Sequence, residues 1–242
     1  MPMSARPLDL PPLFRPVALR EVGDAFAHAT AQAGALGAGT LVFVGRFDLA
    51  ELAVVLEPEE TLFGARRAFY AGMVALADTL AGLAPPETPI ALAWPDAVKI
   101  GGRLVGGGRL AWPRGSGEDA VPDWLVFGAM IRLVSLTGAE ALHPLATALE
   151  DEGFGSIGAE QFVASFARHL MAALDRWQAG DFGLLARDYV AKLPRERGII
   201  HAIDVSGDLR TARPGKADAR ADLKAALATP SWLDPATGGP RL

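Results

Sequence analysis

The stretch AWPDAVKIGGRLVGGGRLAW, residues 93–112, decides how this chain folds, because it has the pattern of two short strands joined by a tight turn. Its Gly101-Gly102 dipeptide is typical of a two-residue hairpin turn. Such a turn pairs Ile100 with Arg103 and Lys99 with Leu104. Since side chains alternate between the two faces of a strand, we expect Arg103 and Lys99 on opposite faces.

Three consecutive glycines follow this turn. Gly106, Gly107 and Gly108 weaken a strand, because glycine loses more backbone entropy than other residues and has no side chain to pack. A run of three therefore indicates that something approaches the backbone closely here. The pattern alone leaves open whether this is a ligand or another segment of the chain.

The same stretch resembles the signature of the biotin protein ligases. The corner Trp94-Pro95-Asp96 followed by Gly102–Gly107 (GRLVGG) is similar to that family's Trp-Pro-Asn-Asp corner, hairpin and Lys-Leu-Ala-Gly strand. The resemblance extends over roughly Leu13 to Leu209. Within the superfamily, the chain is most similar to the biotin/lipoate ligase-like bacterial proteins.

This resemblance implies a chemistry. Biotin and lipoate ligases join a small carboxylic acid to the α-phosphate of ATP with the help of Mg²⁺, then pass the acyl group to a lysine of an acceptor protein. The first step needs a cation to bring two anionic reactants together. Arg103 stands where the family has its lysine, and arginine keeps the charge. Lys99 is the second candidate for this catalytic role.

The resemblance also implies a binding site for the substrate and the nucleotide. Trp94, Asp96 and the backbone of Gly106, Gly107 and Gly108 are expected to line one concave site, with Arg46 at its rim. Asp96 stands for one residue of the family's Asn-Asp pair. No metal-binding side chains are assigned, since the four histidines are far apart in sequence and have no metal-ligand spacing.

Each of these residues also has a purely structural interpretation. Arg103 and Lys99 are equally compatible with solvated charges on a strand, Trp94 with an apolar corner, and Asp96 with a turn cap. The family's long glycine- and arginine-rich loop is reduced here to residues 45–49, in which Arg46 is the single basic residue. Two functions therefore stay open: an ATP-dependent ligase, or a non-catalytic module that binds a small carboxylic acid or an acceptor domain.

The composition excludes several other classes. The chain has 242 residues, half of them apolar, a formal net charge of −5 and scattered basic residues, so it lacks the basic stripe of a nucleic-acid-binding protein. The absence of cysteine excludes the octanoyltransferase branches that form a thioester, and it fits a reducing cytoplasm. The most apolar stretch, residues 68–84, contains Asp78 and predicts a buried helix rather than a membrane span.

Periodicity predicts an α+β fold with one mixed, mainly antiparallel sheet and a small β-element after residue 198. The expected strands are residues 40–45, 51–57, 89–94, 97–112 and 123–136. The expected helices are residues 19–35, 62–83, 159–178 and 182–193. We expect a ligase-like domain over residues 1–193 and a small C-terminal domain or appendage over residues 194–242.

Overall fold

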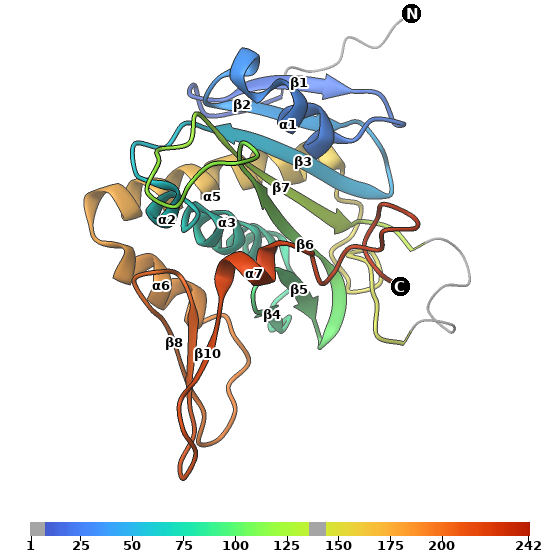
Figure 1. The fold of residues 1–242 in the computed structure, drawn as a ribbon. Helices are drawn as coiled ribbons and strands as arrows, with labels where there is room; N and C mark the ends of the chain where they lie inside the picture. The colour runs from blue at the N-terminus through green and yellow to red at the C-terminus, as the bar shows by residue number, and fades with distance from the viewer. Residues whose placement is uncertain (1–7, 136–143) are drawn as a thin grey trace, which may run out of the picture.

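A seven-stranded sheet forms the centre of the computed structural model, which describes residues 8–135 and 144–242 (Figure 1). The strand order is β1-β2-β3-β7-β6-β5-β4. β1 and β2 pair in parallel, and every other neighbouring pair is antiparallel. The strands are β1 (Arg15–Leu19), β2 (Thr40–Val44), β3 (Leu49–Leu56), β4 (Ile90–Ala93), β5 (Ala97–Ile100), β6 (Arg103–Ala111) and β7 (Leu125–Arg132).

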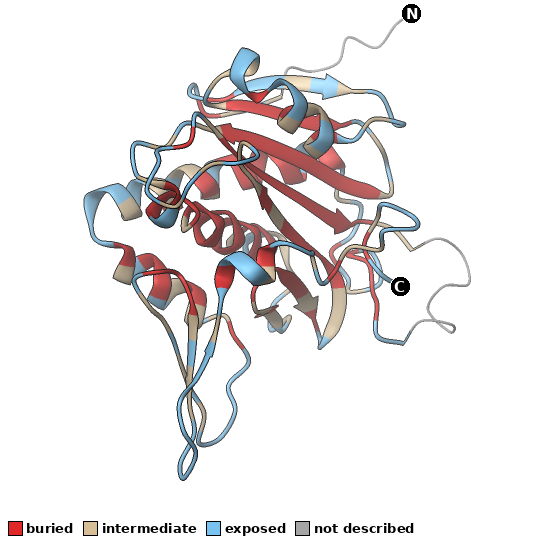
Figure 2. Cartoon of the chain, viewed as in Figure 1, coloured by how far each residue is buried: buried red, intermediate tan, exposed pale blue. Residues whose placement is uncertain are grey.

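Two long helices cover one face of this sheet. α3 (Ala68–Leu83) and α5 (Ala159–Ala179) pack against each other, and α3 is buried along most of its length (Figure 2). α3 can approach the sheet closely because Gly72 leaves room for the Phe127 ring. The other helices of the described residues are α1 (Ala25–Leu36), α2 (Leu62–Ala65), α6 (Phe182–Val190) and α7 (Leu223–Leu227).

The opposite face of the sheet is covered in two parts. Alanines on one side of α1 pack against alternate residues of β2 and β3. Further along the same face, Trp232 of the C-terminal segment packs against Ala97 and Met130. This segment therefore belongs to the packed structure of the sheet.

The hairpin predicted from the sequence is confirmed in its register. Ile100 is opposite Arg103 and Lys99 is opposite Leu104, so Arg103 and Lys99 lie on opposite faces. One step further the register shifts, because β6 has an extra residue at Val105. Such a bulge bends and twists the strand locally.

The predicted fold class is confirmed, and the differences lie at element boundaries. The helix expected from residue 19 begins at Ala25, after Asp24 caps it, and residues 15–19 form the strand β1. The helix expected over residues 62–83 is interrupted at Arg66 and Arg67. The strand expected over residues 123–136 ends at Arg132, and residue 136 lies outside the described residues.

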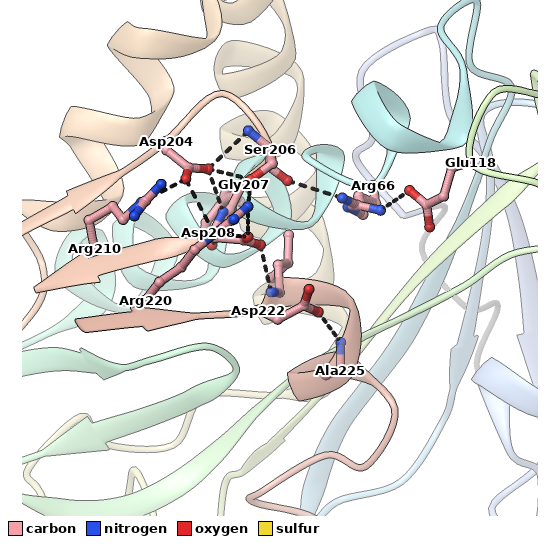
Figure 3. Close-up of polar contacts among 12 residues, drawn as sticks. Arg66, Glu118, Asp204, Ser206, Gly207, Asp208, Arg210, Arg220, Asp222 and Ala225 are labelled. Atoms are coloured by element: carbon pink, nitrogen blue, oxygen red, sulfur yellow. Dashed lines mark hydrogen bonds and ion pairs between the residues drawn. The ribbon is translucent and has the colours of Figure 1, made fainter. Parts of the chain in front are cut away.

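A second, three-stranded sheet contains β8 (Ile200–Ile203), β9 (Leu209–Ala212) and β10 (Ala219–Ala221), as the predicted small β-element. The turn between β8 and β9 holds this sheet together: Asp204 accepts hydrogen bonds from the amides of Ser206 and Asp208 (Figure 3). Asp208 in turn accepts from the amide of Leu223, at the start of α7. Among the described residues, no helix is both long and apolar enough to span a membrane.

Candidate functional site

The arginine of the hairpin is held by an ion pair. Arg103 Nη2 lies 2.6 Å from Glu152 Oε1, and the same oxygen accepts from the Thr147 hydroxyl at 2.7 Å. The chain segment around Thr147 runs beside β6, with Thr147 N donating to the Leu104 carbonyl oxygen. Among the residues that the structure describes, Lys99 has no ion-pair partner.

The Trp94 and Asp96 side chains each bond to another part of the chain. Trp94 Nε1 donates to the Tyr70 hydroxyl at 3.0 Å. The Asp96 carboxylate accepts from the backbone N and the hydroxyl of Ser231, at 2.8 and 2.5 Å. Burial raises the pKa of Asp96 above its ordinary value, although the Ser231 hydrogen bonds act in the opposite direction.

The three glycines make room for other protein segments. A Cβ on Gly106 would lie 1.9 Å from the Met130 carbonyl oxygen of the neighbouring strand. One on Gly107 would lie 2.3 Å from the Trp232 ring, and one on Gly108 2.6 Å from Met73. The sequence left open whether a ligand or another segment of the chain approaches these glycines. The structure shows that other segments of the chain do.

A cavity of about 250 Å³ lies where β7 ends and β3 begins. Its lining comes from the β2–β3 connection, the end of β7, residues 146–147 and the C-terminal segment. Arg46 lines this cavity, but its guanidinium is engaged with Asp48 through two hydrogen bonds of 2.7 Å. These bonds from Arg46 hold the pKa of Asp48 below its ordinary value.

The second arginine of the cavity, Arg132, is buried and has different hydrogen-bond partners from Arg46. It is 9% exposed and donates to the backbone carbonyls of Thr147, Pro240 and Arg241, at 3.5, 2.7 and 3.4 Å. Within the described part of the chain, no carboxylate lies within ion-pair distance of it. Burial lowers the pKa of Arg132, but an arginine remains charged at neutral pH. Among the described residues, the cavity therefore contains a buried positive charge without a paired anion.

Of the residues expected in one concave site, Arg46 alone lines this cavity. Arg103 reaches it indirectly, since its partner Glu152 also binds Thr147 of the cavity wall. Trp94, Asp96 and the glycines lie outside the lining. Arg132 was missed by the sequence reasoning, although a single charge at the end of the apolar run LVFGAMIR is a detectable signal.

A larger cavity of about 680 Å³ lies elsewhere, between the end of β3 and the α5–α6 connection. Its lining includes Glu57, Glu59, Glu60 and Asp181, whereas its cation Arg67 is already paired with Glu60 at 2.6 Å. An anionic ligand suits this environment poorly, because carboxylates outnumber the one cation. The smaller cavity is therefore the better candidate for a carboxylic acid.

The described residues of the smaller cavity do not suit a metal held by the protein. The described carboxylate side chains of its lining are Asp48 and Asp234, and Asp234 already accepts from the Ala236 amide and the Thr237 hydroxyl of its own turn. Over residues 8–135 and 144–242, no group of three or more acidic or histidine side chains is placed to hold a metal ion.

Comparison with known proteins supports the resemblance seen in the sequence. Residues 10–191 match the model of the biotin/lipoate A/B protein ligase family. The chain is similar to a biotin protein ligase-like protein of unknown function from Silicibacter sp. TM1040, with 27% sequence identity and a TM-score of 0.79. The match covers 92% of this chain and 100% of that chain. No curated protein sequence matches the chain.

The fold is also that of biotin protein ligase from Aquifex aeolicus. Its apo structure has 14% identity to this chain and a TM-score of 0.69, covering 87% of this chain and 96% of that one. The structure of its complex with biotin and ATP has 13% identity to this chain and a TM-score of 0.65. The match covers 85% of this chain and 94% of that one. At this level of identity, the similarity concerns the fold alone.

Proposed function

The chain belongs to the biotin/lipoate A/B protein ligase family, and on this premise we propose that it binds a small carboxylic acid of the biotin or lipoate type. The acid lies in the cavity beside β7, with its carboxylate on Arg132. The observation that carries this proposal is the buried guanidinium, which lines the cavity and, among the described residues, binds uncharged carbonyl oxygens and no carboxylate.

The chemistry of arginine supports this assignment. A guanidinium presents several N–H donors in a plane and pairs with a carboxylate through two parallel hydrogen bonds. Such charge-assisted bonds are stronger than bonds to a neutral carbonyl. A carboxylate that reaches Arg132 therefore binds this guanidinium more strongly than the Pro240 carbonyl oxygen does. The partly apolar lining, with Leu49, Val134 and Ala146, suits the hydrocarbon part of such an acid.

Substitution of Arg132 tests the proposal. Binding of biotin, lipoate and octanoate is measured by calorimetry in the native protein and in Arg132→Ala and Arg132→Lys. We expect Arg132→Ala to lose about tenfold or more in affinity, and Arg132→Lys to keep part of it, because lysine retains the charge without the planar fork. Arg114→Ala is the matched control, since Arg114 is exposed and lies outside the cavity. Equal affinity of Arg132→Ala and native protein would contradict the proposal.

A second candidate function is ligation itself, favoured by the position of Arg103. In the first step, a carboxylate oxygen of the acid attacks the α-phosphorus of ATP and pyrophosphate leaves. In the second, the amine of an acceptor-protein lysine attacks the acyl carbon, AMP leaves, and the amine loses its proton. The Arg-Leu-Val-Gly spacing of residues 103–106 matches the family and supports Arg103 for the first step, in which its guanidinium would exchange Glu152 for the α-phosphate.

Pyrophosphate exchange into ATP separates ligation from binding alone. Removing a cation that acts in the transition state costs on the order of 3 kcal/mol, or roughly a hundredfold in rate. We therefore expect Arg103→Ala to abolish exchange and Lys99→Ala to leave it nearly unchanged, since Lys99 lies on the other face of the hairpin. The reverse result would assign the role to Lys99. No exchange with biotin, lipoate or octanoate in the native protein would leave the binding module as the function.

Thermal unfolding supplies an independent comparison. If the acid and ATP occupy one activating site, together they raise Tm more than the sum of their separate effects, because ligands that bind the native state stabilise it according to occupancy. A module that binds only the acid shows no additional stabilisation with ATP.

A further inference from the structure

We propose that the C-terminal segment, residues 229–242, is the lid of this cavity and lifts from the sheet to admit the acid. This inference rests on the proposed acid-binding function. The β2–β3 connection is too short to cover the cavity, and residues 234–242 provide a large part of its wall instead. Figure 1 shows this segment beside β6 and the end of β7.

The segment is fastened to the body of the protein at three places. Ser231 is bonded to the Asp96 carboxylate. Trp232 is fully buried, donates from Nε1 to the Gly108 carbonyl oxygen at 2.8 Å, and covers Gly107, where any side chain would collide with it. At the third place, Arg132 binds the carbonyl oxygens of Pro240 and Arg241.

The segment also bonds to itself, so its residues are coupled to one another. Asp234 N donates to the Gly239 carbonyl oxygen at 2.8 Å, and Arg241 N donates to the Trp232 carbonyl oxygen at 2.7 Å. Arg241 Nε donates to the Ser231 carbonyl oxygen at 2.9 Å. Release at Arg132 is therefore transmitted through Arg241 to Ser231 and Trp232, the two fastenings on the hairpin.

The acid and the lid compete for the same donors. Arg132 Nη2 binds Pro240 at 2.7 Å in the closed arrangement, and the carboxylate of an acid requires the same guanidinium edge. Binding therefore favours the arrangement in which the last residues of the segment have left Arg132. A ligand can shift such an equilibrium only by its difference in affinity for the two arrangements, and the guanidinium–carboxylate pair provides this difference.

A reversible disulfide tests the lid in the full-length chain, which contains no cysteine of its own. The double variant Asp96→Cys/Ser231→Cys replaces two side chains that touch, so oxidation fastens the segment to the sheet. Binding of lipoate is followed by stopped-flow measurement in the oxidised and reduced forms of the same variant. We expect oxidation to slow association and to weaken apparent affinity roughly tenfold or more, because fewer molecules are open. Both forms lack Asp96, so their difference reports on the fastening alone.

A second variant loosens the attachment of the segment instead of fastening it. Ser231→Ala removes one hydrogen bond of the fastening and is expected to raise the association rate severalfold, with Ser116→Ala as the control in an exposed loop. Equal rates in the oxidised, reduced and native proteins would overturn the lid and leave acid binding intact. Binding by none of these forms, native protein included, would overturn the acid-binding function on which the lid rests.

Discussion

Buried charges on one face of the sheet are the main feature at the scale of single residues. On β3, Glu51 is 2% exposed and accepts a hydrogen bond of 2.8 Å from the Ala25 amide at the start of α1. On β6, Arg109 lies over the Phe26 ring, with its guanidinium carbon 4.0 Å from the ring centre. Both residues face α1, so this side of the sheet contains charged side chains, whereas the residues of β3 and β7 that face α3 and α5 are apolar.

Glu51 makes stability depend on pH. Burial is the largest cause that raises its pKa above the ordinary value, and the hydrogen bond from Ala25 acts against it. A carboxyl whose pKa is raised by folding binds a proton more tightly in the folded state, so its contribution to stability falls as pH rises through the ordinary value toward the raised one. Glu51→Gln keeps an acceptor for Ala25 and does not titrate. The Tm of this variant relative to the native protein should therefore increase between about pH 4 and pH 7. Thermal scans at several pH values measure this difference. If the Tm of the variant relative to the native protein stays constant or falls over this range, the raised pKa of Glu51 is contradicted.

The sequence predicts the position of a side chain correctly where the contacts that determine it are local. Arg103 and Lys99 were assigned to different faces because pleat alternation and a two-residue turn determine this within six residues. The hydrogen-bond partner of Asp96 could not be predicted from the local sequence, since Ser231 lies 135 residues away along the chain. Arg132 was missed for a similar reason: its environment is set by the carbonyl oxygens of Pro240 and Arg241, which no local pattern connects with β7.

At the scale of elements, periodicity located the sheet and its covering helices, and tertiary contacts changed their limits. β1 contains Pro16 and pairs in parallel with β2, so it shows little strand signal of its own. The helix over residues 62–83 is interrupted where Arg66 turns toward Glu118 and Ser206, and Arg67 toward Glu60 and Val205. The apolar run gave no indication of this break, because it is caused by segments far away in the sequence.

Gly107 gives a test at this scale. A Cβ there would lie 2.1 Å from the Asp96 carbonyl oxygen and 2.3 Å from Trp232, so neither the hairpin nor the C-terminal segment can keep its position. Gly107→Ala should lower the free energy of unfolding by about 1–3 kcal/mol, as overpacking of a close contact does. Gly117→Ala is the control, since nothing lies within 4 Å of a Cβ at that position, and it should change stability by less than about 0.5 kcal/mol. Urea unfolding measures both variants, and equal stabilities would contradict the close approach.

For the whole molecule, the decisive feature is how the C-terminal part joins the main sheet. Leu223 and Leu227 of α7 are buried in the same core as α3, and β8 packs against α6. The turn between β8 and β9 is attached by Tyr70, whose hydroxyl donates to the Gly207 carbonyl oxygen at 2.5 Å, and by Arg66, which reaches the Ser206 carbonyl oxygen (Figure 3). The division into domains at residue 193 stays a prediction.

Tyr70→Phe tests this attachment. Burial raises the pKa of Tyr70, so its hydroxyl keeps its proton at neutral pH and donates to Gly207 while accepting from Trp94. Removing the oxygen leaves a buried carbonyl without this donor and the Trp94 N–H without this acceptor, at a cost of about 1–3 kcal/mol. Because Gly207 belongs to the turn of the small sheet, we expect amide hydrogen exchange to accelerate in β8 and β9 more than in β3.

Tyr189→Phe is the matched control for this experiment, since its buried hydroxyl donates to the Pro95 carbonyl oxygen at the hairpin corner instead. It should lower Tm without a selective effect on the small sheet. If Tyr70→Phe accelerates exchange equally in β3, β8 and β9, the small sheet opens only with the whole molecule. The hydroxyl then contributes to overall stability and does not act as a separate point of attachment.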